Sequence, residues 1–134
     1  MNDRVRWAAL LIMASAVAIV IGSVSIARGD APAAPAAGDP AHGQLVYQVC
    51  MGCHSVDEDD VGPRHRRVVG RVAGTVAGYP YSPALKAAGF AWDAAKLDAW
   101  LQNPQGLVPG TKMFFVLPDA KDRADVIAYL ATLR

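Results

Sequence analysis

Cys50-Met51-Gly52-Cys53-His54 is the most informative stretch of the sequence, because it places two thiols three residues apart and an imidazole directly after them. The chain has only 2 cysteines, which excludes a disulfide-dense scaffold and a four-cysteine zinc site. Its 134 residues make one domain at most. A formal net charge of +1 argues against a nucleic-acid binder that neutralises phosphates. The chemistry of this chain is therefore expected around these five residues.

Cys-x-x-Cys-His spacing is typical of the covalent attachment of a c-type haem. Two thiols at this spacing can each add to one vinyl group of the same macrocycle, and the following imidazole can then reach its iron. A thioredoxin-like redox pair would need a βαβ context, and a disulfide across two residues is strained. A zinc site would need two further ligands, for which only His42 and His65 are available. We therefore predict one haem c, linked through Cys50 and Cys53, with His54 on the iron.

The second axial ligand of the iron is predicted to be Met113. It follows the turn sequence Val108-Pro109-Gly110-Thr111-Lys112, which can hold a loop rigidly at the iron. Met51 lies between the two cysteines and cannot reach the opposite face of the ring. A gap-filling role for Met113, and ligation by His42 or His65 instead, are the alternatives. Imidazole plus thioether ligation fills both axial positions and raises the reduction potential, which indicates electron transfer rather than substrate chemistry.

The N-terminal residues 1–27 read as a membrane-targeting segment. Arg4 and Arg6 precede an uncharged and mostly apolar run, which as a helix would span about 30 Å of hydrocarbon. The arginines predict a cytoplasmic N-terminus and export of the remaining chain. The length of the run favours a retained anchor, while small residues near its end leave a cleaved signal peptide open. An Ala/Pro-rich linker at 28–38 then leads to a haem domain at 39–134.

Helix signals and long loops alternate through the haem domain. Capping residues and prolines predict helices at 39–54, 82–89 and 93–103, and a last helix that opens at Pro118-Asp119. The segments 55–81 and 103–117 are predicted loops, and no stretch alternates with period two for long enough to predict a sheet. The predicted class is all-α. Loops of this length in a small domain need a large cofactor to pack on.

From Asp39 to the C-terminus the sequence resembles a class I cytochrome c, close to the bacterial cytochrome c2 and mitochondrial cytochrome c branch. The resemblance rests on ordered motifs: CMGCH at 50–54, Gly62-Pro63, Gly70-Arg71, GYPYS at 78–82, Trp92, LQNP at 101–104, VPGTKM at 108–113 and RADVIAYL at 123–130. It implies the class I cytochrome c fold around one covalently bound haem. Together with the N-terminal segment, it also implies similarity to the membrane-anchored cytochrome cy type.

The resemblance further implies roles for individual residues around the haem. The Pro63 carbonyl is expected to orient the ring of His54, which tunes the metal. Positions that surround the haem propionates are matched by side chains that can donate hydrogen bonds or positive charge: Arg71, Tyr81, Ser82 and Trp92. Thr111 matches a position that bonds a propionate or flanks the methionine ligand. Gly43 and Tyr47 match positions at which the first helix packs on the last.

Three features depart from the family pattern: the segment 64–67, Trp100, and an acidic loop from Asp57 to Asp60 beside that segment. The segment 64–67, Arg-His-Arg-Arg, replaces the usual glycine-and-leucine pattern after Gly-Pro. Within it, His65 stands where the family packs a leucine against the haem. Trp100 stands where mitochondrial relatives carry a tyrosine that bonds the methionine sulfur.

The predicted function is that of an electron carrier without enzymatic activity, which shuttles single electrons between respiratory or photosynthetic membrane complexes. The expected partners are a quinol-oxidising complex of the bc1 type and a terminal oxidase or photosynthetic reaction centre; nucleic acid is not among them. The expected location is the periplasmic side of a bacterial inner membrane, anchored by the N-terminal helix or soluble after cleavage. A haem sensor or peroxidase-like enzyme with an open iron position, and a dedicated redox partner of one periplasmic enzyme, are the alternatives.

Overall fold

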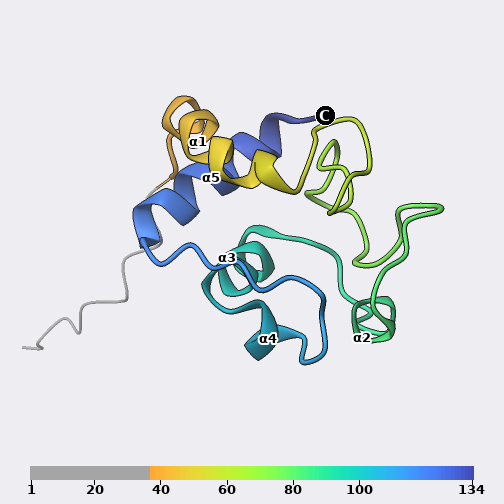
Figure 1. Ribbon diagram of the computed structural model, residues 1–134. Helices are drawn as coiled ribbons and strands as arrows, with labels where there is room; N and C mark the ends of the chain where they lie inside the picture. Colours follow the sequence, from red (N-terminus) through yellow and green to blue (C-terminus); the bar gives the residue numbers. More distant parts are fainter. Residues whose placement is uncertain (1–36) are drawn as a thin grey trace, which may run out of the picture. The chain divides into compact units, whose positions relative to one another are not determined.

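The computed structural model describes residues 37–134, so the predicted segment at 1–27 and most of the linker at 28–38 lie outside the described residues. The described part contains α1 (Pro40–Val46), the 3-10 helix η1 (Tyr47–Gly52), α2 (Pro83–Lys86), α3 (Ala94–Gln102), α4 (Pro104–Leu107) and α5 (Ala120–Thr132) (Figure 1). Pairing between extended segments in these residues is limited to one isolated bridge between Val72 and Ala91. The all-α prediction is therefore confirmed. From residue 37 onward, no helix has the length and apolar character that crossing a bilayer would require.

Side chains supplied by the sequence cap the first turns of the helices. The caps of α1, α2, α3 and α5 are Asp39, Ser82, Asp93 and Asp119. Each accepts hydrogen bonds from amides that a helix start leaves without partners. Proline occupies the first turn of α1 and α2, where its missing N–H is no loss. These four predicted starts are confirmed.

The first helix is shorter than predicted, because α1 ends at Val46 and the chain continues as the tighter η1. At the end of η1 the amides of Cys53 and His54 both donate to the Cys50 carbonyl, at 3.1 and 2.9 Å. These two hydrogen bonds form a tight turn within the Cys-x-x-Cys-His stretch. Helical backbone therefore extends to Gly52, near the predicted end at His54, but it is α-helical only to Val46.

The predicted loop at 103–117 also differs from the structure, because it begins with the short helix α4. The Asn103 side chain accepts a hydrogen bond from the Gly106 amide at 2.9 Å, and Pro104 occupies the first turn. Four residues are too few to display a helical period in the sequence. The capping residue and the following proline were the only available signal.

Helices α1 and α5 cross at close range, as Figure 1 shows. A methyl group on Gly43 would come within 1.9 Å of the Asp125 backbone oxygen, so the crossing depends on a glycine. Where η1 begins, Tyr47 is 2% exposed, and its ring lies 5.2 Å from that of Tyr129 between centroids. The first and last helices therefore pair as the resemblance implies.

A buried carboxylate joins the start of the domain to α5. Asp125 accepts hydrogen bonds from the Asp39 amide at 2.8 Å and from His42 Nδ1 at 2.7 Å, and it also binds the Lys121 ammonium. Lys121, followed by the Asp39 amide, lowers the pKa of Asp125 to about 2. The carboxylate is therefore charged and fully partnered at neutral pH.

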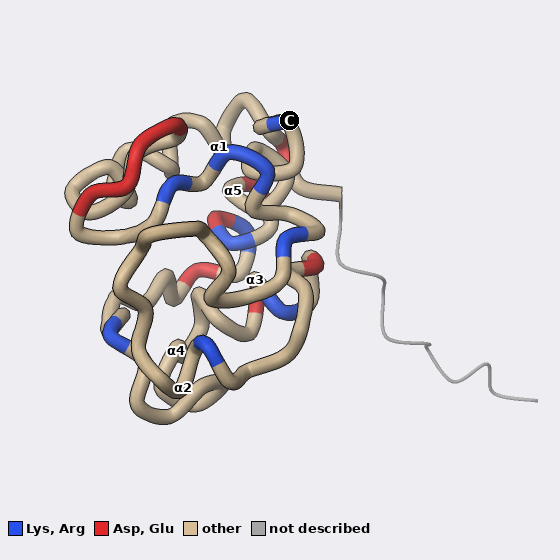
Figure 2. Tube along the Cα trace, turned by 90° about the vertical axis from the view of Figure 1, so that its right-hand side faces the viewer, with Lys and Arg blue, Asp and Glu red and all other residues tan. Residues whose placement is uncertain are grey.

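Ion pairs join two parts of the loop between η1 and α2. An acidic stretch at 57–60 lies close to the basic stretch at 64–67 (Figure 2). Arg64 pairs with Asp59 at 3.1 Å, and Arg66 pairs with Asp57. Exposed ion pairs contribute little to stability, so these pairs serve mainly to set the shape of the loop.

Arg67 has a left-handed backbone, with φ of 57°, and its amide donates to the Leu133 carbonyl at 2.7 Å. This conformation costs a non-glycine residue about 1–2 kcal/mol, whereas glycine adopts it freely but loses roughly 0.5–1 kcal/mol of additional backbone entropy. Arg67→Gly is therefore expected to raise the free energy of unfolding by about 0.5–1 kcal/mol in denaturant titrations. The control is Val69→Gly at an exposed position of the same loop. This change should lower the free energy of unfolding, because Val69 has no positive φ. A loss of stability in Arg67→Gly would contradict this account.

Candidate functional site

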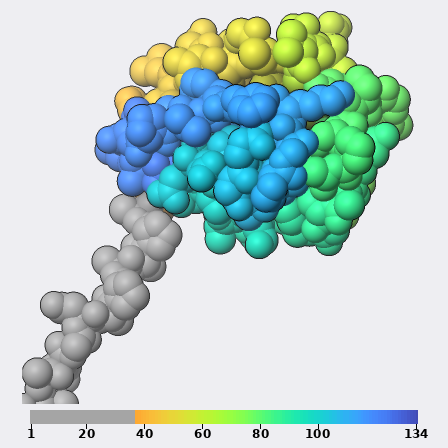
Figure 3. Space-filling view, turned by 60° about the horizontal axis from the view of Figure 1, so that its bottom comes forward, coloured from red at the N-terminus to blue at the C-terminus, as the bar shows by residue number. Residues whose placement is uncertain are grey.

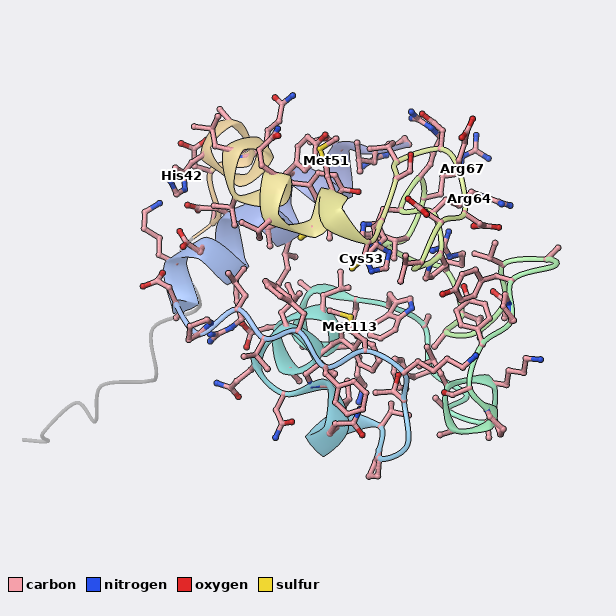
Figure 4. The ribbon with its side chains drawn as sticks, viewed as in Figure 1. His42, Met51, Cys53, Arg64, Arg67 and Met113 are labelled. Carbon is pink, nitrogen blue, oxygen red and sulfur yellow. The ribbon has the colours of Figure 1, made fainter. Side chains whose placement is uncertain are left out.

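A pocket with mainly apolar walls is lined by residues of η1, α3 and α5 and by the segment 111–115. All of the residues predicted to bind the cofactor line this pocket: Cys50, Cys53, His54, Pro63, Arg71, Tyr81, Ser82, Trp92, Thr111 and Met113. Figure 4 shows Cys53 and Met113 on opposite sides of this space. His42, an alternative ligand in the sequence, is not among the lining residues.

The two cysteines bring free thiols to the pocket from the end of η1. Cys50 is half-buried and Cys53 is exposed. Burial, with a smaller contribution from Cys53, raises the pKa of Cys50 to about 11, so this thiol keeps its proton at neutral pH. Addition of an S–H group across a vinyl double bond consumes a thiol of this kind. The pair is therefore suited to forming two thioether links.

His54 presents one free ring nitrogen. Its Nδ1 lies 2.8 Å from the Pro63 carbonyl oxygen, and because a carbonyl can only accept, Nδ1 carries the hydrogen. Nε2 then keeps a lone pair that can coordinate a metal. A methyl group on Gly62 would lie 2.2 Å from Cε1 of the ring, so the close approach of this loop needs glycine. Burial lowers the pKa of His54, which favours the neutral form that binds metals.

His65 lies directly against His54. The two rings are stacked, with centroids 4.0 Å apart and planes inclined by 21°. His65 Nδ1 and the Tyr47 hydroxyl are hydrogen-bonded at 3.0 Å. Burial, with the nearby His54 and Arg71, lowers the pKa of His65 to about 3, so its ring is neutral at pH 7. The residue that replaces the family leucine is thus in contact with the predicted ligand.

Met113 is held by hydrogen bonds that reach its loop from α4. The Gln105 side-chain amide donates to the carbonyls of Thr111 at 2.8 Å and Met113 at 3.1 Å, and its oxygen accepts from the Gly110 amide at 3.2 Å. In Figure 3 the segment that follows α4 lies between the N-terminal elements and the α3–α4 region. The loop is therefore fixed at Met113 itself and on its N-terminal side.

Trp100 of α3 donates a hydrogen bond from its Nε1 to the Met113 sulfur at 3.1 Å. Despite the departure at position 100, the indole therefore still provides a donor to the methionine sulfur. It uses one lone pair of the thioether and leaves the other free for a metal. Trp100 is 7% exposed, so this weak bond is shielded from water.

The remaining predicted residues supply the polar part of the pocket. Arg71 donates to the carbonyls of Arg64 and Arg66 at 2.8 and 3.1 Å. Ser82 accepts from the Leu85 amide at 3.1 Å, so it caps α2 as well as lining the pocket. Tyr81, Trp92 and Thr111 are buried. This mixture of one cation and several hydroxyl and indole groups is suited to buried carboxylates.

The donor set fits a covalently linked haem: two free thiols, an imidazole with an available Nε2, a fixed thioether and apolar walls. Fold and pocket together define an all-α c-type haem protein. A family model described as "Cytochrome c" matches residues 40–134, and the chain belongs to the cytochrome c family. Its cofactor is a single covalent haem c, and it is an electron carrier between respiratory or photosynthetic complexes rather than an enzyme.

Named relatives agree with this assignment. The chain is 49% identical over 119 residues to "Cytochrome c2" of Rhodomicrobium vannielii, which covers 86% of this chain and 95% of that protein. It is 46% identical over 99 residues to "Cytochrome c-type cyt cy" of Rhodobacter capsulatus, covering 72% of this chain and 50% of the relative. Among solved structures, cytochrome cH from Methylobacterium extorquens has a TM-score of 0.69 and 45% identity, covering 71% of this chain and 99% of the other.

Two contacts at the site were not predicted from the sequence. Gln105 lies one residue after Pro104 with no motif to mark it, although its side chain fixes the Met113 loop. The bond between Tyr47 and His65 joins residues 18 positions apart, which local patterns cannot relate. The unusual histidine at position 65 was the only available signal for that contact.

Trp100→Phe removes the N–H donor to the Met113 sulfur and keeps most of the aromatic packing. The positive end of the N–H dipole disfavours the additional positive charge of the oxidised iron. Loss of this donor is therefore expected to lower the reduction potential by about 20–60 mV, which is the equivalent of one net hydrogen bond. Equilibrium redox titration of the holoprotein measures this change. Phe90→Leu is the control, because Phe90 is a partly buried aromatic residue that does not line the pocket. Equal potentials in Trp100→Phe and the parent would contradict the role of the indole.

Proposed function

We propose that His54 and Met113 are the axial ligands of the haem iron, with Cys50 and Cys53 as its covalent attachment points. The observation that carries this proposal is the placing of both donors in one pocket, each fixed by a separate hydrogen-bond system. An iron with both axial positions filled exchanges electrons without binding a substrate. The same proposal places the propionates near Arg71, Tyr81, Ser82, Trp92 and Thr111.

The proposed electron donor is a quinol-oxidising complex of the bc1 type, and the proposed acceptor is a terminal oxidase or photosynthetic reaction centre. Exposed apolar side chains at the pocket support docking there: Val49, Val61, Phe114 and Phe115. The domain at 39–134 has 10 basic and 10 acidic residues, so steering by net charge is weak. Short-lived docking through this surface suits a redox encounter.

The proposed location is the periplasmic side of a bacterial inner membrane, with the segment at 1–27 as a retained anchor. The two arginines ahead of the apolar run support this orientation, and so does the similarity to a protein named cytochrome cy. The mass of the protein purified from membranes tests the proposal. A mass that includes residues 1–27 supports the anchor, and a mass without them supports cleavage.

The spectrum of the oxidised holoprotein tests the ligation. We expect a low-spin spectrum with the weak far-red band of iron–thioether ligation, together with rapid reduction by quinol in the presence of a bc1-type complex. A high-spin oxidised protein that binds cyanide at once would instead support a sensor or peroxidase-like activity. A protein with the expected spectrum that exchanges electrons with only one periplasmic enzyme would support the dedicated-partner alternative.

A further inference from the structure

We propose that His65 is a positioning residue that sets the ring plane of His54. The inference rests on the proposed ligation of the iron by His54 and goes beyond it. Its basis is the stacked contact of the two imidazoles, with centroids 4.0 Å apart and planes inclined by 21°.

Two different motions of the His54 ring need to be restricted. The hydrogen bond from Nδ1 to the Pro63 carbonyl fixes the direction in which Nδ1 points. This single hydrogen bond still permits the ring to rotate about the line that joins Nδ1 of His54 to the Pro63 oxygen. A second flat ring against its face opposes that rocking, because the two faces would separate or collide. His65 therefore restricts a motion that Pro63 leaves free.

His65 is itself held from two directions. Its backbone amide donates to the Ser55 carbonyl at 3.0 Å, which ties it to the residue after His54. Its Nδ1 is bonded to the hydroxyl of Tyr47, whose side chain is 2% exposed and packs against Tyr129 of α5. The helix pair α1–α5 is thereby connected to the ring of His54 through two aromatic side chains.

A leucine at this position would fill space but would offer no flat face and no hydrogen-bond partner for Tyr47. The plane of an axial imidazole governs how the unpaired electron of the oxidised haem is distributed over the ring. The paramagnetic shifts of the four haem methyl groups report that distribution in the NMR spectrum. They report ring orientation directly and do not depend on electron-transfer activity.

The experiment compares holoprotein variants by the order and spread of these methyl resonances. His65→Leu removes the flat ring and the hydrogen bond, and we expect a changed order or spread. His65→Phe keeps a flat ring, and we expect a pattern closer to the parent than that of His65→Leu. Tyr47→Phe keeps the packing of α1 on α5 and removes only the hydroxyl, and we expect a smaller change than in His65→Leu. Val69→Ala, an exposed change in the same loop, is the control.

Parent-like methyl shifts in His65→Leu would overturn the positioning role, and so would equal changes in His65→Leu and His65→Phe. If His65→Leu fails to fold, the other two variants decide, because each keeps a flat ring against His54 and loses the hydrogen bond between His65 and Tyr47. A parent-like order of the methyl resonances in both supports the stacking, and a changed order in both overturns it. A His54→Ala variant that keeps the methyl pattern of the parent would instead refute the ligation by His54. The two failures are thus distinguishable.

Discussion

Met113→Ala is expected to abolish the weak far-red band of the oxidised protein and to lower its reduction potential by on the order of 0.2 V, within the ~0.8 V range that axial ligands set. A thioether favours the reduced iron, and alanine leaves water or an external ligand to take its place. The oxidised variant should bind cyanide much faster than the parent. Absorption spectroscopy, redox titration and cyanide mixing measure the three effects.

Met51→Ala is the matched control for this experiment. Met51 is 54% exposed and lies between the two cysteines, so its loss should leave the band and the potential unchanged. A Met113→Ala protein that retained the far-red band would show that another group ligates the iron. His65, already in contact with His54, would not fit that role, because it lies on the side of the proposed histidine ligand.

Gly43→Ala is expected to destabilise the fold by about 3 kcal/mol or more, in the upper range of overpacking effects. Helix propensity alone predicts the opposite sign, since alanine in a helix is about 1 kcal/mol more favourable than glycine. The methyl group would lie 1.9 Å from the Asp125 backbone oxygen, and the backbone of α5 can yield only if the two helices separate. Packing therefore outweighs propensity. The free energy of unfolding of the holoprotein in denaturant is the measurement.

Gly52→Ala is the control for the glycine substitution, because a methyl group there would meet no atom within 4 Å. Its stability should remain close to that of the parent. If Gly43→Ala were as stable as Gly52→Ala, the close crossing of α1 and α5 would not be a feature of the protein in solution.

The chemistry of this site was predictable because it is encoded locally. Cys50, Cys53 and His54 lie within five residues, and the capping residues mark helix starts by their own side chains. Elimination of the other methionines, together with the Pro/Gly turn, made Met113 the candidate for the second ligand. The sequence was less informative where geometry depends on tertiary contacts: the Tyr47 hydroxyl meets His65, 18 positions further along the chain.

The contacts that Trp100 and His65 make with Met113 and His54 could not be predicted either, because they also depend on the tertiary fold. Trp100 reads as a departure from the family pattern, and only the fold turns its N–H toward the sulfur of Met113. His65 reads as a departure from a family pattern, and only the fold stacks it on His54. Long-range contacts of this kind have no period and no fixed spacing in the chain.

The three hydrogen bonds from Gln105 to the segment 110–113 bear on the speed of the reaction. They hold the methionine backbone whatever charge the iron carries, and Trp100 restrains the sulfur itself. Bond lengths and dipoles around the metal then need little adjustment when an electron arrives or leaves. A low reorganisation energy follows, which permits fast exchange at a small driving force and over a brief encounter.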